Sequence, residues 1–394
     1  MDEKKETRLC PYSRRCSGCQ LQNMTYTRQL KHKQITAIKL LGRFAHVEEI
    51  IGMAEPFHYR NKVSAMFGAK NGRLFSGIYQ STGKNIVPVE ECLIEDKTSQ
   101  EIISSITKLA QSFKMQAFSR ETGRGFLKHI LVRRGFKSGQ IMAVIVTGEG
   151  AFPSQRSFVN AVIKKHPEIT TLVRNINKSR VGLLLGKDNE VLFGSGYIED
   201  ELLGMKFRIS PQSFYQVNPV QTEVLYGKAA EFAGLSGEET LLDCYCGTGT
   251  IGLIMSKKAK RVIGAELNPE AVNDAKANAA LNGVTNAEFL CCDAGEFMTQ
   301  LAERGESADV VITDPPRAGC SREFLSALVK MSPKRVVYVS CNPETLARDL
   351  RFLTKNGYRA QIIQPVDMFP FTSHVECVVS ITKTSSHNQP EKAN

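Results

Sequence analysis

A cysteine at the end of an apolar strand is the residue of this sequence best placed for chemistry. Residues 336–339 are β-branched or aromatic, a run typical of a strand buried in a parallel sheet, and Cys341 follows them. Asn342 and Pro343 then suit a helix start, and an apolar stripe continues that helix through Leu346, Leu350 and Leu353. A helix N-terminus favours the nucleophilic thiolate, so Cys341 is predicted to be a nucleophile, with a buried structural cysteine as the alternative.

A glycine-rich turn between a strand and a helix is the second chemical feature. Residues 241–252 run from two leucines through Asp243 into the turn that contains Gly247 and Gly249. Glu266 ends the next apolar run, close to the spacing of about 20 residues at which an acid meets a ribose in a Rossmann unit. This pattern fits a dinucleotide fingerprint, so an NAD-dependent oxidoreductase is one interpretation.

A second acidic turn changes that interpretation. Residues 309–313 predict another buried strand, and Asp314-Pro315-Pro316-Arg317 follows directly. This places a carboxylate at the carboxyl edge of the sheet, where a bound ligand and its reacting partner would meet. A D-P-P turn after a nucleotide-binding strand is typical of S-adenosylmethionine-dependent methyl transfer to nucleic-acid bases, and we do not expect it in a dehydrogenase.

A cluster of cysteines near the start predicts a metal site. Cys10, Cys16 and Cys19 have the spacing C-x5-C-x2-C, and Cys92 is the next cysteine in the chain. A reducing cytosol disfavours disulfides among the eleven cysteines, so clustered thiols indicate metal or catalysis. Four thiolates hold either zinc or an iron-sulfur cluster, and spacing alone does not separate these two.

Charge and length limit the class of protein. The chain of 394 residues is long enough for two or three domains, and its net charge of +11 favours a polyanionic partner such as RNA. No apolar run reaches a membrane-spanning length, and the charged start, residues 1–6, does not resemble a signal peptide. We therefore expect a cytoplasmic protein with no membrane partner, no obligate protein partner and a monomeric state.

The pattern of predicted secondary structure changes near residue 204. Strands dominate from about residue 55 to 200, where the expected elements are two hairpins (63–79 and 126–147), helices at 99–113 and 157–165, a strand at 170–175 and a hairpin near 194–204. After residue 204 strands and helices alternate, which predicts a parallel α/β sheet. The central unit also carries basic residues that could line an RNA surface: Arg60, Lys62, Arg124, Lys128, Arg133 and Arg134.

Five motifs in order resemble the RNA uracil-5 methyltransferase family. They are F-Y-Q-V-N at 214–218, the turn at 243–249, D-P-P-R at 314–317, S-C-N-P at 340–343 and H-V-E-C at 374–377. The similarity covers nearly the whole chain. The cysteine pattern resembles the ribosomal-RNA branch that carries a [4Fe-4S] cluster, although nine residues before Cys10 leave no room for the oligonucleotide-binding barrel with which many relatives begin.

This resemblance implies a fold and a division of the chain. The expected fold class is α/β, with a Rossmann-like class I methyltransferase domain at 204–384. It is preceded by a cysteine-rich iron-sulfur segment with a basic helix at 1–50 and by a mixed α+β, RNA-binding central domain at 51–203. Residues 385–394 are polar and expected to form a disordered tail.

The resemblance also assigns site residues. It implies that the cluster is held by Cys10, Cys16, Cys19 and Cys92, and that S-adenosylmethionine is bound by Gln216, Tyr245, Thr250, Glu266, Asp293 and Asp314. Thr250 has an alternative role as a helix cap.

The implied reaction is methyl transfer to carbon 5 of a uridine, in 23S rRNA or, as the alternative, in tRNA. Cys341 would add to carbon 6 and make carbon 5 nucleophilic, and Glu376 would remove the carbon 5 proton. A structural hydrogen-bonding role is the alternative for Glu376. A catalytically silent RNA-binding protein is the more distant alternative for the whole chain.

Overall fold

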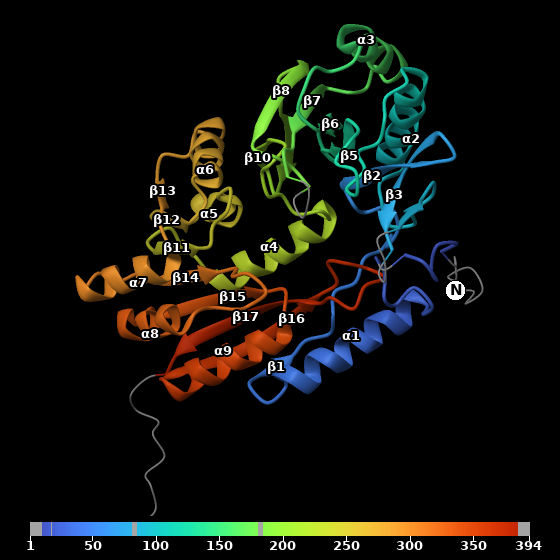
Figure 1. Cartoon of the computed structure of the whole chain (residues 1–394). Helices are drawn as coiled ribbons and strands as arrows, with labels where there is room; N and C mark the ends of the chain where they lie inside the picture. The colour runs from blue at the N-terminus through green and yellow to red at the C-terminus, as the bar shows by residue number, and fades with distance from the viewer. Residues whose placement is uncertain (1–9, 17, 81–84, 180–183, 385–394) are drawn as a thin grey trace, which may run out of the picture.

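The computed structural model describes residues 10–16, 18–80, 85–179 and 184–384, which build two large β-sheets. In the described part of the chain, the larger sheet has eight strands in the order β1-β16-β17-β15-β14-β11-β12-β13 (Figure 1). Its strands are β1 (His46–Val47), β11 (Thr240–Cys244), β12 (Arg261–Glu266), β13 (Ala287–Cys291), β14 (Val310–Thr313), β15 (Arg335–Ser340), β16 (Tyr358–Val366) and β17 (Glu376–Lys383).

The direction of the strands brings several turns to one edge of this sheet. Strands β11 to β15 pair in parallel, whereas β17 runs antiparallel between β15 and β16. The start of β17 therefore lies at the same edge as the end of β15. Strand order also reverses between β14 and β11, which is where an open α/β sheet binds its ligand.

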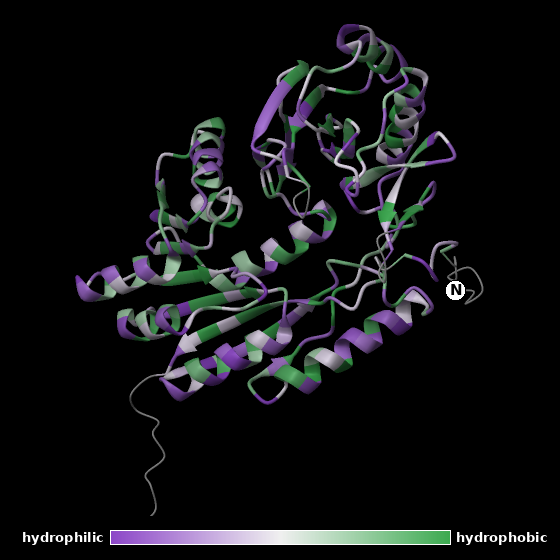
Figure 2. Ribbon diagram, viewed as in Figure 1, coloured by the Kyte–Doolittle hydropathy of each residue, from purple (hydrophilic) through white to green (hydrophobic). Residues whose placement is uncertain are grey.

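Helices cover both faces of the larger sheet. One face carries α4 (Pro219–Ala233), α5 (Thr250–Ser256) and α6 (Pro269–Leu281), and the other carries α1 (Tyr26–Leu41), α7 (Ala294–Glu303), α8 (Arg322–Met331) and α9 (Pro343–Lys355) (Figure 1). Figure 2 shows that the strands are largely hydrophobic, while the helices carry many hydrophilic residues. Burial of the strands on both faces explains their continuous apolar runs, and this Rossmann-like architecture confirms the predicted α/β class.

The second large sheet forms a separate layer between residues 62 and 193. Its order is β4-β3-β2-β5-β6-β7-β8, and α2 (Lys97–Ser112) and α3 (Gln155–Lys165) pack against it. Its two predicted hairpins are present. The strands are β2 (Lys62–Lys70), β3 (Arg73–Tyr79), β4 (Ile86–Pro88), β5 (Leu127–Arg134), β6 (Ile141–Thr147), β7 (Thr171–Ile176) and β8 (Asp188–Phe193).

The hairpin expected near 194–204 lies later in the chain than its glycines suggested. Strands β9 (Ile198–Leu202) and β10 (Met205–Ile209) pair with each other around the turn at Leu203 and Gly204. Leu203 and Gly204 both have positive φ, 50° and 76°. Glycine adopts such a φ without steric cost, whereas leucine rarely does. The earlier Gly194 and Gly196 instead turn the chain after β8.

The predicted cysteine-rich segment is joined to the larger sheet. Helix α1 packs beside α9, and β1 pairs in parallel with β16. The predicted domain boundaries stay predictions, and the predicted tail at 385–394 lies outside the described residues. Within the described ranges, every helix falls short of the length and apolar character that crossing a membrane requires.

Candidate active site

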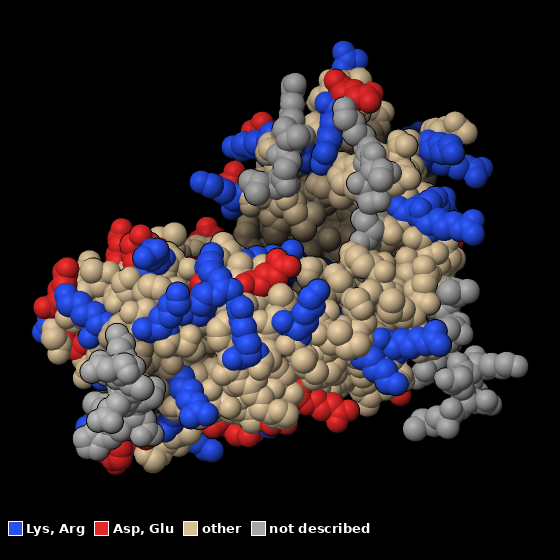
Figure 3. Space-filling view, turned by 90° about the horizontal axis from the view of Figure 1, so that it is seen from below, with Lys and Arg blue, Asp and Glu red and all other residues tan. Residues whose placement is uncertain are grey.

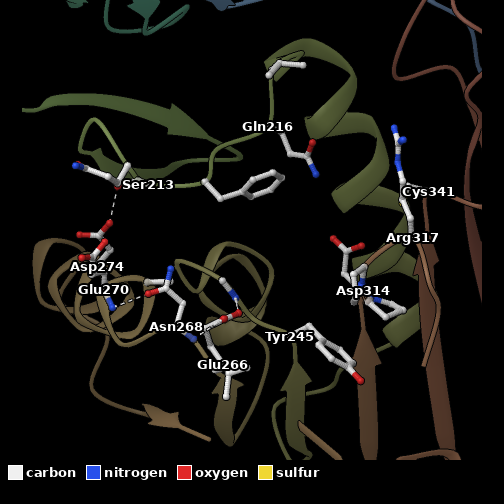
Figure 4. A pocket seen from close by; sticks show the side chains of 18 of the residues that line it. Ser213, Gln216, Tyr245, Glu266, Asn268, Glu270, Asp274, Asp314, Arg317 and Cys341 are labelled. Atoms are coloured by element: carbon white, nitrogen blue, oxygen red, sulfur yellow. Dashed lines mark hydrogen bonds between the residues drawn. The ribbon is translucent and has the colours of Figure 1, made fainter. Parts of the chain in front are cut away.

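One large cavity opens at the carboxyl edge of the larger sheet. It encloses about 1250 Å³ and lies between this edge and the loop of residues 210–217 that precedes α4. From Glu266 it runs past Tyr245 and Asp314 to Arg317 and Cys341 (Figure 4). Of the predicted catalytic and cofactor residues, those that line the cavity are Gln216, Tyr245, Glu266, Asp293, Asp314, Cys341 and Glu376.

The glycine-rich turn after β11 shapes the floor of this cavity. Tyr245 and Gly247 have positive φ, 65° and 56°, so the chain turns sharply as it leaves the strand. A side chain at Gly247 would meet no atom within 4 Å, because this glycine faces open space. The turn thus leaves room for a ligand to approach the backbone.

Glu266 ties this turn to the next strand end. Its carboxylate accepts one hydrogen bond from the Gly247 amide (3.0 Å) and another from the Asn268 amide (2.8 Å). These two bonds fix the carboxylate at the cavity wall. Each carboxylate oxygen keeps further acceptor capacity, which suits recognition of a pair of ribose hydroxyls.

Three other predicted cofactor residues differ in what they contribute. Asp293 caps α7 by accepting from the Gly295 and Glu296 amides, and it also lines the cavity. Gln216 donates weakly to the Tyr226 hydroxyl (3.4 Å) and extends into the cavity (Figure 4). Thr250 does not line the cavity; its hydroxyl lies 3.2 Å from that of Thr248 at the start of α5.

Asp243 is a fully buried acid in β11, and Asp314 is a half-buried acid that lines the cavity. Burial raises the pKa of each to about 7. One oxygen of Asp243 accepts from the Gly252 amide (2.7 Å), while its Oδ1 is buried and has no hydrogen-bond partner among the described residues. No role was predicted for Asp243, although an acid near the end of the strand before the glycine turn is a signal visible in the sequence.

Cys341 and Glu376 meet at the ends of neighbouring antiparallel strands. Ser340 is paired with Cys377 at the end of the β15–β17 ladder, so Cys341 and Glu376 are the next residues beyond it. Asn342 caps α9 by accepting from the Glu344 amide (3.0 Å), which places Cys341 directly before this helix as the sequence predicted. Two residues that are 35 positions apart in the chain thus face one cavity.

The charges around Cys341 oppose its ionisation. Burial raises the pKa of its thiol to about 11, and the carboxylates of Glu376 and Asp314 add to this shift, while Arg317 opposes it. Burial likewise raises the pKa of Glu376 to about 8. Burial and the two acids therefore oppose the activation by the helix N-terminus that the sequence suggested. A thiolate at this position requires additional positive charge in the cavity.

Two further cavity residues, Arg317 and His374, were not predicted to have a role. Arg317 follows the D-P-P turn, and its guanidinium lies 3.4 Å from the Nε2 atom of His374. Both line the same end of the cavity as Cys341. Their signal was their position inside the motifs at 314–317 and 374–377. Arg317 brings a compensating positive charge to the thiol and to Glu376.

Replacing Glu376 by glutamine should stabilise the protein at alkaline pH. A carboxyl whose pKa is raised by folding, here from 4.5 to about 8, favours the folded state at low pH and loses this contribution as the pH rises through the folded value. We expect Glu376→Gln to unfold at nearly the wild-type temperature at pH 5 and about 3 °C or more above it at pH 8.5. Differential scanning calorimetry across this range checks the prediction, and equal slopes for both proteins would contradict it.

The four predicted cluster cysteines line one small pocket. Cys10, Cys16, Cys19 and Cys92 surround about 40 Å³ of space that Phe371 also lines. Burial raises the pKa of the Cys19 thiol to about 12, and nearby Cys16 and Cys10 raise it further. Among the residues that the structure describes, no three His, Cys, Asp or Glu side chains are grouped to hold one metal ion.

Half of the basic residues expected to line an RNA surface have structural partners instead. Arg133 is buried and donates to the Ser213 carbonyl (2.6 Å), and Arg134 pairs with Asp96 (2.8 Å). Lys128 is buried too and donates to backbone carbonyl groups. The amino-acid types indicated charge, but only the fold shows which charges face inward.

Comparisons with known proteins place this site in a family. The family model described as tRNA (Uracil-5-)-methyltransferase matches residues 184–384, a stretch that holds every predicted catalytic and cofactor residue. The chain belongs to this family. Its membership favours the methyltransferase interpretation of the glycine turn over the oxidoreductase one.

Individual relatives extend the similarity over nearly the whole chain. An RNA methyltransferase of Oceanobacillus iheyensis is 44% identical over 93% of this chain and 81% of its own length. Another, from Clostridium acetobutylicum, is 41% identical over 97% of this chain and 85% of its own. Both are named RNA methyltransferases without a stated substrate position.

A solved structure confirms the fold of this family member. The tRNA (uracil-54, C5)-methyltransferase of Pyrococcus abyssi, solved in complex with S-adenosyl-L-homocysteine, has a TM-score of 0.78 and 30% sequence identity. The alignment covers 93% of this chain and 86% of that one. The Rossmann-like methyltransferase fold and the mixed sheet before it are therefore shared.

Proposed function

We propose that this protein transfers a methyl group from S-adenosylmethionine to carbon 5 of a uridine in RNA. The observation that carries this proposal is the convergence of Cys341 and Glu376 at one end of a cavity whose other end holds Glu266. A thiol and a carboxyl lie side by side next to a space large enough for the cofactor. They can supply the nucleophile and the base that methylation of carbon 5 requires. Family membership supports the same reaction.

The cavity suits S-adenosylmethionine by charge and by shape. That cofactor supplies an electrophilic methyl group on a positively charged sulfonium. Asp314 and Glu376 lie near Cys341, so the cavity is acidic where a cation would sit. Glu266 and the open Gly247 would hold the ribose and the neighbouring backbone, and Asp293 would accept from the adenine amino group.

Cys341 would begin the reaction as the nucleophile. Its sulfur forms a bond to carbon 6 of the uracil, and the electron pair of the 5,6 double bond moves into the ring as an enolate, which makes carbon 5 reactive. Carbon 5 would then form its bond to the methyl group as the bond from that methyl to the sulfonium sulfur breaks, which leaves S-adenosylhomocysteine as the neutral by-product. Positive charge in the cavity favours the thiolate needed at the start.

Glu376 would complete the reaction as the base. It takes the proton from carbon 5, the double bond re-forms, and the bond between the sulfur of Cys341 and carbon 6 breaks. A pKa near 8 suits a general base that works close to neutral pH, because the carboxylate then binds the proton firmly enough. Burial also keeps water away from this carboxylate.

RNA is the substrate class that the surface charge supports. In the view of Figure 3, Lys and Arg side chains cover more of the molecule than Asp and Glu do, in line with a net charge of +11. Arg60 lines the cavity, and beside it Lys62 has its pKa lowered to about 8 by burial and by Arg133 and Arg60. The target uridine must leave its stack to enter, which favours loops or single strands.

We propose 23S rRNA as the substrate, with tRNA as the alternative. The N-terminal cysteine pattern supports the ribosomal branch, whereas the Pyrococcus abyssi relative acts on tRNA. The protein should be incubated with S-adenosylmethionine and with unmodified 23S rRNA or tRNA separately, and 5-methyluridine measured by nucleoside mass spectrometry. We expect product from 23S rRNA alone. Product from tRNA alone would overturn the branch, and none from either would overturn the reaction.

A [4Fe-4S] cluster remains our proposal for the four cysteines. In such a cluster each thiolate binds a different iron, so the sulfur atoms need not converge on one point as they do for zinc. Four neighbouring thiols in one pocket, three of them within the same short segment, suit this donor set. Cluster binding would order residues 10–19 against Cys92. Iron and sulfide analysis of anaerobically purified protein tests it, with about four of each expected and a zinc-only result against it.

A further inference from the structure

A buried ion pair joins the first helix to the loop that precedes Glu376. The Nζ atom of Lys33 lies 2.6 Å from Oδ1 of Asp367, and their side chains are 1% and 0% exposed. Lys33 also donates to the Phe369 carbonyl (3.0 Å), while the Tyr26 hydroxyl donates to the other oxygen of Asp367 (2.9 Å). Buried charges persist where they are paired and hydrogen-bonded, and both conditions hold here.

This ion pair sits beside the catalytic strand. The loop of residues 367–375 connects β16 to β17, and Val366, just before it, is the cross-strand partner of Glu376. From the same loop, Phe369 and His374 line the cavity. The position of the loop therefore determines both one wall of the cavity and the point at which Glu376 enters it.

Further bonds hold the middle of the loop to the same N-terminal region. The Phe371 amide donates to Oε1 of Gln29 (2.7 Å), and its carbonyl accepts from the Leu21 amide (2.9 Å). Phe371 has a φ of 69°, a left-handed conformation that a bulky residue adopts only where its surroundings impose it. Residues 21–33 thus impose a conformation on a loop more than 330 positions away.

We propose that Lys33 and Asp367 are positioning residues for the removal of the carbon 5 proton. They act through Glu376, whose carboxylate accepts that proton while the bond between Cys341 and carbon 6 breaks. This inference rests on the proposed function. Cys341 is positioned by β15 and α9 and has no hydrogen bond to the 367–375 loop among the described residues. Loss of the ion pair should therefore slow release of the product much more than formation of the covalent intermediate.

The most informative variant removes both charges together. Lys33→Met alone would leave the Asp367 carboxylate buried without a counter-charge, so its folding is at risk. The double variant Lys33→Met/Asp367→Asn leaves no buried charge without a partner. It still loses the ion pair and the hydrogen bond from Lys33 to the Phe369 carbonyl. Arg174→Met is the matched control, because Arg174 is a buried cation paired with Glu190 (3.2 Å) in the other sheet.

Single-turnover reactions with the RNA substrate separate the two steps. The denaturant-resistant protein–RNA complex reports the intermediate, and 5-methyluridine in released RNA reports its resolution. For the double variant we expect intermediate formation within about 2-fold of wild type and release slowed by about 10- to 100-fold. For Arg174→Met, both rates should match wild type even if its thermal stability falls.

Two results would overturn the inference: release at the wild-type rate in the folded double variant, or equal slowing of both steps. If the double variant fails to fold by circular dichroism, Tyr26→Phe takes its place, since it removes one hydrogen bond to Asp367 and should slow release to a smaller extent; an unchanged release rate then counts against the inference. A wild-type protein that makes no 5-methyluridine would instead refute the proposed function itself.

Discussion

Replacing Cys341 by alanine should lower the rate of 5-methyluridine formation by at least about 1,000-fold. Without the thiol, no bond forms to carbon 6, and carbon 5 stays too weakly nucleophilic to accept the methyl group. The side chain is small and only half-buried, so its loss should leave the fold and the binding of S-adenosylmethionine nearly unchanged. Nucleoside mass spectrometry of the product and calorimetric titration of the cofactor measure the two effects separately.

The matched control is another cysteine of the same domain. Cys291 is exposed at the end of β13 and does not line the cavity, so Cys291→Ala should methylate at the wild-type rate. If Cys341→Ala retained the wild-type rate, the covalent route would be excluded, although methylation by another route would stand. Equal losses in both variants would indicate general damage by the substitution.

Replacing Glu376 by glutamine should trap the methylated intermediate. Glutamine has nearly the same shape and suits the buried position, but it cannot accept the carbon 5 proton, so the bond between Cys341 and carbon 6 persists. We expect a protein–RNA complex that survives denaturation to accumulate, while multiple-turnover product falls by about 100-fold or more. Denaturing gels with labelled RNA show the complex.

A carboxyl outside the cavity provides the comparison for this variant. Glu344 is exposed in the first turn of α9, three residues after Cys341, and its side chain does not line the cavity. Glu344→Gln should therefore turn over normally without accumulating the complex. Normal turnover by Glu376→Gln would leave Glu376 with only a structural hydrogen-bonding role.

Local sequence patterns were sufficient to predict much of this fold. The β-branched run at 336–339 and the Asn342-Pro343 start gave β15 and α9, because both elements depend on neighbouring residues alone. The Asn71-Gly72 pair likewise predicted the turn between β2 and β3. The hairpin after β8 was placed too early, since several glycines compete there and packing decides which of them forms the turn.

The candidate site was predictable where each residue ends a strand. Parallel strands bring their carboxyl ends together, so Glu266, Asp314 and Cys341 could be expected at one edge from sequence alone. The balance of charges was not predictable from the sequence, because the raised pKa of the Cys341 thiol depends on burial and then on Glu376, which comes from a strand that returns antiparallel.

Side-chain contacts between residues far apart in the chain could not be predicted from the sequence either. The ion pair of Lys33 with Asp367 joins residues 334 positions apart, and no local pattern marks either one. The same holds for Arg133, which is buried and donates to carbonyl groups of the loop that precedes α4, about 80 positions later in the chain. These are contacts of tertiary structure, and they determine where the active-site loops lie.

Peptide mass spectrometry of the trapped complex would show whether Cys341 forms the covalent bond to the uridine. Glu376→Gln protein would be mixed with S-adenosylmethionine and the RNA substrate, digested with nuclease and protease, and searched for a modified peptide. We expect one peptide, containing Cys341, that carries a uridine nucleotide with one additional methyl group. A nucleotide on another cysteine, or released 5-methyluridine with no modified peptide, would contradict it.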